Sequence, residues 1–308
     1  MTCRAAVAAN CAVCPDEIMI TTEKITEENK QEYEALIPPD EAENIGRAFY
    51  KGLAARGDDS GELQGALIWE LKHAEKDGVE NEVHLSFVTA KDPDTGRALF
   101  DGFKEAATEA KAVRSTVELP AGEGKEKRDL LSGEHFSFRE KEAEELVVTI
   151  GDLASTKIAK KSALPPFVKP LGMLMQRTFR RGIMNCIFHA KRDLLEDLAT
   201  LPLKWYEPAV SCYVETDGKP NAFLLVHKTA SGNLRIEMLA GFGADIRTNL
   251  LYLIRFSAMK AVETYPPETR IILPRRDDAA RQLVSKVFPK RMGKQVLFGV
   301  REEVASDD

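Results

Sequence analysis

The chain has 308 residues, a hydrophobic fraction of 44%, a charged fraction of 30% and a formal net charge of −6 at pH 7. This composition is typical of a soluble globular protein, and the length allows two domains of ordinary size. The acidic balance argues against general binding to nucleic acid, and no apolar run is long enough to span a bilayer, so neither nucleic acid nor a membrane is expected as a partner.

Residues 1–17 are expected to precede the folded part of the chain. Three of the five cysteines lie in this alanine-rich segment, at Cys3, Cys11 and Cys14. The spacing of Cys11 and Cys14 is that of half a zinc site, but neither a second such pair nor a nearby His completes it, so no metal is expected. The segment is too weakly hydrophobic for a signal peptide, so we predict a disordered extension and a cytoplasmic location.

Hydrophobic periodicity and turn signals predict alternating strands and helices in the first half of the chain. The expected order is a strand over 18–26, helices over 27–37 and 40–57, strands over 62–75 and 82–90, a helix over 97–111, a strand over 113–120, and a short helix with a closing hairpin over 128–151. Pro38 and Pro39 separate the first two helices, and Asp40 is a suitable N-cap for the second. The alternation predicts an α/β arrangement.

The second half repeats part of this order after a connection over 152–170 that carries three prolines and several lysines. The expected elements are helical structure over 173–202, strands over 221–229 and 233–241, a helix over 247–261, a strand over 269–274, a helix over 277–289 and a last strand over 294–302. Both halves therefore contain the series strand, strand, helix, strand.

The two copies of this series can be placed in register by adding 151 to a residue number. The apolar positions Val83, Leu85, Phe87, Leu99, Phe100, Phe103, Ala107 and Ala110 then correspond to Leu234, Ile236, Met238, Leu250, Leu251, Ile254, Ala258 and Ala261. The first three pairs keep the period of two of a strand, and the others keep helical spacing. We predict a duplicated unit, with domains over 18–151 and 171–303, a linker over 152–170 and a disordered tail over 304–308.

From Ile18 to Glu303 the order of elements resembles the fold of the GCN5-related N-acetyltransferases (GNAT), here in tandem. In that family a strand and two helices precede an antiparallel meander, and a strand then leads through a phosphate-binding loop into a helix. The resemblance implies the fold class: α/β with mixed sheets, in two GNAT-like domains. It also implies acetyl-CoA as the co-substrate, no metal, and an amine of a small molecule or peptide as the acceptor.

The family's acyl-CoA loop has the pattern Arg/Gln-x-x-Gly-x-Gly/Ala, in which small residues let the backbone at a helix N-terminus approach the pyrophosphate. The segment from Pro93 to Leu99 matches the last two positions of the pattern and has a proline at the first. By resemblance, the cofactor-binding residues of the first half are Val88, Thr89, Gly96, Arg97, Ala98 and Leu99. The second half lacks both small residues, although Gly241 and Gly243 precede its loop and Arg247 is a possible phosphate partner.

Catalysis in this family relies on the backbone of the strand before the loop and on a carboxylate that removes a proton from the amine. In the second half that strand carries Glu237, and in the first half it carries His84. The resemblance makes these two residues the candidate catalytic groups. The alternative for Glu237 is an exposed strand residue paired with Lys or Arg, and the alternative for His84 is a surface strand residue.

We therefore expect an N-acetyltransferase that moves an acetyl group from acetyl-CoA to an amine, with the cofactor in the first half. The alternative is a non-catalytic protein that retains the fold as a binding scaffold, because neither loop matches the motif fully. A third possibility changes the donor to aminoacyl-tRNA, as in the tandem Fem-type transferases. Its one hint is a basic stretch over 157–192, for which counter-charges at Glu196 and Asp197 offer a simpler explanation.

Overall fold

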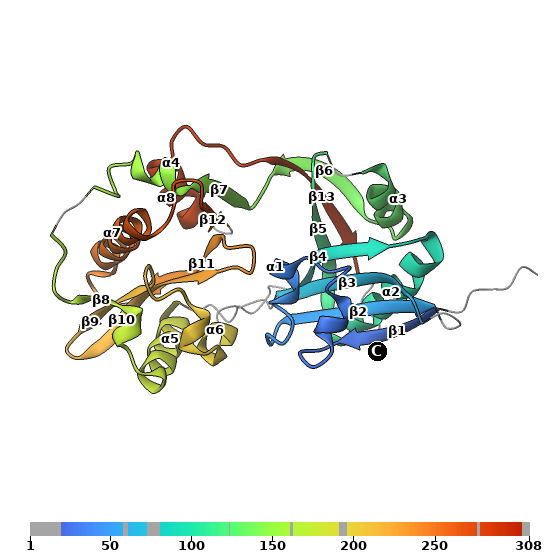
Figure 1. The fold of residues 1–308 in the computed structure, drawn as a ribbon, viewed down its shortest axis with the longest axis horizontal. Helices are drawn as coiled ribbons and strands as arrows, with labels where there is room; N and C mark the ends of the chain where they lie inside the picture. Colours follow the sequence, from blue (N-terminus) through green and yellow to red (C-terminus); the bar gives the residue numbers. More distant parts are fainter. Residues whose placement is uncertain are drawn as a thin grey trace, which may run out of the picture.

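The computed structural model describes residues 20–57, 61–72, 81–122, 124–160, 163–190, 196–275 and 278–303. It has two lobes, each built on one mixed sheet with helices packed on it (Figure 1). The predicted α/β architecture is confirmed. The expected N-terminal extension, its cysteines and the expected C-terminal tail lie outside the described residues.

The first lobe is built on a seven-stranded sheet. Its order is β1 (Ile20–Ile25), β2 (Tyr50–Gly57), β3 (Leu63–Lys72), β4 (Asn81–Ala90), β5 (Ala112–Pro120), β13 (Gln295–Glu302) and β6 (Ser137–Glu142). Its helical segments are the 3₁₀ turn η1 (Lys30–Tyr33), α1 (Pro39–Ala42), α2 (Pro93–Glu109) and α3 (Lys125–Gly133). Neighbouring strands are antiparallel except for the parallel pair β4 and β5.

The second lobe is built on a six-stranded sheet. Its order is β7 (Glu145–Thr149), β12 (Arg270–Pro274), β11 (Leu234–Gly241), β10 (Lys219–Lys228), β9 (Cys212–Thr216) and β8 (Val168–Pro170). Its helical segments are α4 (Ile150–Ala154), η2 (Leu171–Met173), α5 (Gln176–Ala190), α6 (Glu196–Thr200), η4 (Leu203–Trp205), α7 (Ile246–Thr264) and α8 (Asp278–Val287). Here β11 and β12 form the parallel pair.

Both sheets are covered on both faces, so their central strands are apolar without alternation. In β10, Leu224 packs in the cluster that contains α7, whereas Phe223 and Leu225 pack in the cluster that contains α5. In the first lobe α2 buries Phe100 and Phe103 completely, and the ring of Phe103 meets that of Trp69 edge-on at 5.5 Å. Each lobe thus has its own core.

The expected closing hairpin at the end of the first half is wrong. Instead of pairing with each other, β6 pairs with β13 and β7 pairs with β12. The chain crosses between the lobes after β6 and again before β13, so that β7 (green) lies in one sheet and β13 (red) in the other (Figure 1). Each half of the sequence therefore completes the sheet of the other half with one strand.

Further expectations need correction, and the first is the helix expected over 27–37, where only the 3₁₀ turn η1 forms. The helix expected over 40–57 ends at Ala42 in α1, and residues 50–57 form β2. Because β2 is paired on both sides and buried on both faces, its small apolar residues show no strand period, and the sequence pattern is ambiguous there. β9 was not expected from the sequence, and the expected linker contributes α4 and the edge strand β8.

Candidate functional site between the two sheets

In both lobes the two parallel strands part before they end. The pairing of β4 with β5 stops at Leu85↔Val117, although the strands continue to Ala90 and Pro120. The pairing of β11 with β12 covers Leu234↔Ile271 and the next residue pair and stops there. A gap therefore opens toward the carboxyl ends of both strand pairs. Along this gap, β4 does not pair with β5, and β11 does not pair with β12.

A one-residue bulge marks the same place in both sheets. In β4, Ser86 is the extra residue opposite β3, and in β11, Glu237 is the extra residue opposite β10. The two residue numbers differ by 151, so the two bulges occupy equivalent positions when the halves are aligned by the offset predicted from the apolar pattern. A bulge changes the direction of a side chain and is frequent next to functional sites.

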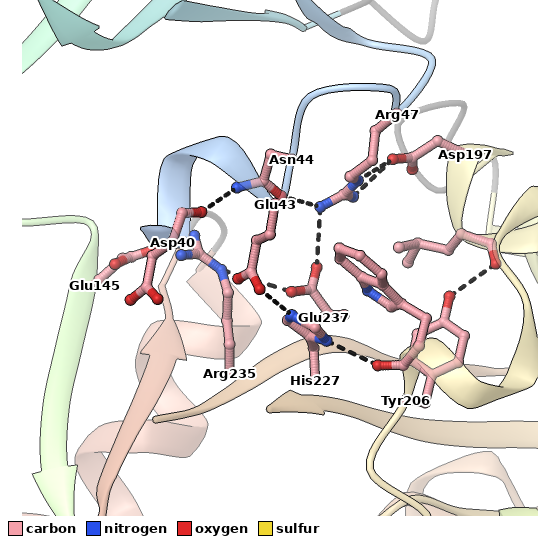
Figure 2. Close-up of polar contacts among 12 residues, drawn as sticks. Asp40, Glu43, Asn44, Arg47, Glu145, Asp197, Tyr206, His227, Arg235 and Glu237 are labelled. Carbon is pink, nitrogen blue, oxygen red and sulfur yellow. Dashed lines mark hydrogen bonds and ion pairs between the residues drawn. The ribbon is translucent and has the colours of Figure 1, made fainter. Parts of the chain in front are cut away.

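Figure 2 shows that Glu237 points into a cluster of charged side chains between the lobes. We call this group the interlobe cluster, and its members are Asp40, Glu41, Glu43, Arg47, Glu145, Asp197, His227, Arg235 and Glu237. Glu237 has an exposed side-chain fraction of 9%, and its oxygens lie 3.9 Å from Arg47 Nη1 and 3.8 Å from Arg235 Nε. Its charge is therefore compensated from both lobes.

Arg47 is the main link of the cluster. Its Nε and Nη2 donate hydrogen bonds to one oxygen of Asp197 at 2.9 and 2.6 Å, and its Nη1 donates to Asn44 at 3.0 Å. Its guanidinium also lies 4.8 Å from the centre of the Tyr50 ring. Burial raises the pKa of Asp197, and the nearby Arg47 opposes this shift. Arg47 belongs to the segment between α1 and β2, whereas Asp197 lies in α6 of the other lobe.

His227 forms a second link. Its Nε2 lies 3.2 Å from a carboxylate oxygen of Glu43 of the first lobe, and its Nδ1 lies 2.7 Å from the carbonyl oxygen of Trp205. The imidazole stacks on the Trp205 ring at 4.1 Å. Burial lowers the pKa of His227, but Glu43 and the Trp205 carbonyl outweigh burial and the net pKa is raised. A neighbouring backbone N–H, that of Ala230, also donates to Glu43.

The cluster carries more negative than positive groups. Asp40 accepts from the N–H of Ser231, and Arg235 pairs with Glu145 of β7. Glu41 accepts from the bulged Ser86 at 2.8 Å, and burial raises its pKa against the effects of Ser86 and Arg235. Six carboxylates thus gather around two guanidinium groups and one imidazole. The excess favours a cationic neighbour.

His84, the other candidate catalytic residue, lies on β4 at the position that corresponds to Arg235 on β11. Its Nδ1 is 3.0 Å from the hydroxyl of Thr116, which donates to Glu82 at 2.9 Å. These residues sit at the last paired stretch of β4 and β5, before the gap opens. His84 and Glu237 therefore lie on different sheets.

The cofactor residues expected in the first half are arranged around the N-terminus of α2. Val88 and Leu99 are core residues, Thr89 and Ala98 are half-buried, and Arg97 is exposed beside Asp94. Gly96 is buried, and a Cβ there would overlap the side chain of Leu130 from α3. A side chain at Gly96 would therefore require the Leu130 side chain to shift.

The N-terminus of α2 already holds an anionic group of the chain itself. Asp92 accepts a hydrogen bond from the N–H of Thr95 at 2.8 Å, and this contact lowers the pKa of the Asp92 carboxyl. The carboxylate therefore occupies the first-turn position where a phosphate would be expected.

The corresponding helix of the second half, α7, has no side-chain cap at its N-terminus. Gly243 in the preceding loop has a φ of +111°, which favours glycine, and the nearest atom to a Cβ there would be 3.7 Å away. Arg247 and Thr248 of the first turn are exposed. The N-cap residue is again an aspartate, Asp245, but its exposed side chain makes no capping hydrogen bond, so the first-turn N–H groups of α7 are left for an anion, unlike those of α2.

The described residues show no group of three or more His, Cys, Asp or Glu side chains that could hold a metal ion. Across the same residues, no helix is long and apolar enough to cross a membrane.

No family model matches the sequence, and no curated protein matches it either. Among solved structures, a tandem GNAT protein from the clavulanic acid biosynthesis pathway is similar over 94% of this chain and 100% of its own, with a TM-score of 0.56 and 13% identity. A putative acetyltransferase from Pyrococcus horikoshii is similar over 94% of this chain and 91% of its own, with a TM-score of 0.49 and 11% identity. A GCN5-related N-acetyltransferase from Kribbella flavida is similar over 92% of this chain and 71% of its own, with a TM-score of 0.46 and 12% identity. The first similarity confirms the GNAT-like fold that the sequence predicts, and it bears on the fold alone.

Proposed function

We propose that the protein transfers an acetyl group from acetyl-CoA to an amine, with the cofactor held by the second half of the chain rather than the first. The gap between β11 and β12, the bulge at Glu237 and the uncapped N-terminus of α7 all belong to this half. The first half has the same gap and a bulge at Ser86, but there Asp92 caps α2 and no carboxylate lies at the bulge, so the α7 N-terminus without a side-chain cap is the observation that carries the proposal.

Acetyl-CoA would supply the acetyl group as a thioester. The N–H groups of the first turn of α7, together with Arg247, are suited to the pyrophosphate, and Gly243 allows close approach of the backbone. Backbone groups of β11 along the gap are suited to orient the thioester carbonyl and to donate to its oxygen. The first-half residues from Val88 to Leu99 remain the competing site.

The ammonium group of the acceptor would first lose one proton, and the neutral amine nitrogen would then attack the thioester carbonyl. As the carbon–sulfur bond breaks, a second proton would pass from the nitrogen to the leaving thiolate, so that CoA leaves as the thiol. Glu237 is the carboxylate at the bulge beside the gap, and we assign it the role of proton acceptor. The excess of carboxylates in the interlobe cluster would attract a cationic amine. His84 lies in the other sheet and is assigned no step.

Calorimetry of the full chain with acetyl-CoA tests the cofactor site. Arg247→Glu should weaken binding roughly 10- to 100-fold, because it replaces a charge-assisted contact with repulsion. Arg97→Glu is the control, since Arg97 is an exposed arginine near the N-terminus of α2. Weaker binding by Arg97→Glu, with unchanged binding by Arg247→Glu, would instead favour a cofactor site in the first half. If acetyl-CoA produces no binding heat with the unmodified protein, both sites are refuted.

The second candidate function is a binding scaffold without catalysis. It is favoured by the ion pairs that hold Glu237 and by the Asp92 carboxylate on α2. Thiol release from acetyl-CoA in the presence of primary amines separates the two functions. Turnover that falls roughly 100-fold or more in Glu237→Gln, with unchanged acetyl-CoA affinity, supports acid–base catalysis. Acetyl-CoA binding without thiol release from any amine supports the scaffold.

A further inference from the structure

Helix α5 presents an outward face that is both basic and apolar. Its buried side is formed by Phe179, Ile183, Cys186 and Ile187, which pack against the second sheet. Exposed on the opposite side are Arg177, Arg180, Arg181, Met184 and Phe188. Their spacing of three, four, seven and eleven residues from the first places all five on one stripe of the helix.

The apolar side chains of this stripe are unusually exposed. Phe188 has an exposed fraction of 78% and Met184 of 46%, and just before the helix Met173 and Met175 reach 68% and 74%. These four are half of the large hydrophobic residues exposed in the described part of the chain. We call them, together with Arg177, Arg180 and Arg181, the α5 face. So dense a group on an otherwise acidic protein marks an interaction surface.

The positive charge of this face is not balanced within its own helix. α5 contains three arginines and no acidic residue. The sequence suggested Asp197 as a counter-charge, but its carboxylate is bound by Arg47 of the other lobe at 2.6 and 2.9 Å. Asp197 is therefore engaged by Arg47 and does not serve as a counter-charge to the arginines of α5.

We propose that the α5 face docks on the surface of an anionic lipid bilayer. Arginines beside protruding Met and Phe side chains match a surface that is anionic at the headgroups and apolar just below them. A symmetric contact between two copies of the chain would bring the arginines of both copies together, which disfavours it. A nucleic acid would leave the methionine side chains without an apolar partner. The expectation of no membrane partner, drawn from the lack of a spanning segment, does not cover this mode of binding.

Flotation of the full chain with vesicles tests the proposal. The protein should float with phosphatidylcholine vesicles that contain phosphatidylserine, remain unbound with phosphatidylcholine alone, and be released at high salt. Arg177→Gln with Arg181→Gln should lower partition about 30-fold, from about 1 kcal/mol for each arginine. Met184→Ser with Phe188→Ser should lower it roughly 100-fold at unchanged charge, since burial of each side chain contributes about a factor of ten or more.

Matched controls use exposed residues elsewhere. Arg97→Gln with Arg270→Gln removes the same charge, and Leu251→Ser removes an apolar side chain that is 51% exposed on α7. These variants should bind vesicles like the unmodified chain. No flotation with anionic vesicles, equal flotation with neutral ones, or equal loss in the controls would overturn the proposal. Tighter binding to a single-stranded oligonucleotide, or self-association abolished by Phe188→Ser in the absence of lipid binding, would overturn it in favour of those partners.

Discussion

Replacing Arg47 by methionine should destabilise the protein strongly, because it removes the main link between the lobes. The exposed side-chain fraction is 9% for Arg47 and 3% for Asp197, so the variant leaves a buried carboxylate without its partner. Loss of one member of such a pair costs about 3–5 kcal/mol. The contact of the guanidinium with the Tyr50 ring contributes roughly a further 0.5–1 kcal/mol.

A double-mutant cycle separates the pair from its surroundings. Asp197→Leu alone should cost less than Arg47→Met, because Arg47 keeps Glu237 at 3.9 Å. The double variant removes both buried charges and should be more stable than Arg47→Met alone. We expect a coupling energy of about 2 kcal/mol or more between the two positions.

The assay is urea unfolding followed by circular dichroism and by tryptophan fluorescence. The chain has two tryptophans, of which Trp69 lies in the core of the first lobe and Trp205 lies 6.0 Å from Arg47 in the cluster. Because the sheets exchange strands, Trp69→Phe and Trp205→Phe should report coincident transitions. This account of the cluster would be refuted if the effects of Arg47→Met and Asp197→Leu on the free energy of unfolding add to within about 0.5 kcal/mol. Separate unfolding transitions for the two lobes would also refute it.

Three other predictions concern single sites. The pKa of His227 is raised in the folded state, so protonated His227 stabilises the fold below the unfolded pKa of about 6.5. This contribution to stability is lost as the pH rises through the pKa of the folded state. In a Glu43→Gln variant, the urea midpoint should lose this dependence on pH. Burial raises the pKa of Cys186 to about 12 and that of Cys212 well above its ordinary value. In a variant whose three N-terminal cysteines are replaced by serine, a thiol reagent should therefore label these two cysteines slowly in the native chain and both of them on unfolding. Fast labelling of the native chain would contradict the packing. A Cβ at position 182 would lie 2.6 Å from the Phe223 ring, so Gly182→Val should destabilise the protein by about 1–3 kcal/mol in thermal unfolding, whereas Gly122→Val, where nothing lies within 4 Å, should not.

The apolar pattern of the sequence predicted most elements and the internal register correctly. The 151-residue offset that aligns Val83 with Leu234 also aligns the bulges at Ser86 and Glu237. Periodicity is a local property, so it survives in the sequence wherever one face of an element is buried. β2 is buried on both faces and lacks that signal, which is why its sequence does not predict a strand.

The site was only partly accessible from the sequence. Glu237 could be found because it lies on the strand before a loop, but Arg47 is 150 residues away from its partner Asp197 and lay in a segment expected to be helical. No spacing rule joins such a pair. Likewise, the anionic Asp92 carboxylate at the N-terminus of α2 was visible as a nearby charge, whereas its hydrogen bond to Thr95 was not.

The repeated strand–strand–helix–strand unit and its offset thus follow from the sequence, because side chains that share a buried face must recur with the period of their element. Which strand completes which sheet follows from the fold instead, since β7 and β13 satisfy their backbone hydrogen bonds in the opposite lobe. The fold also decides where the buried charges find their partners. Hydrogen bonds and ion pairs depend on distance in space, and the fold alone brings Arg47 and Asp197 together.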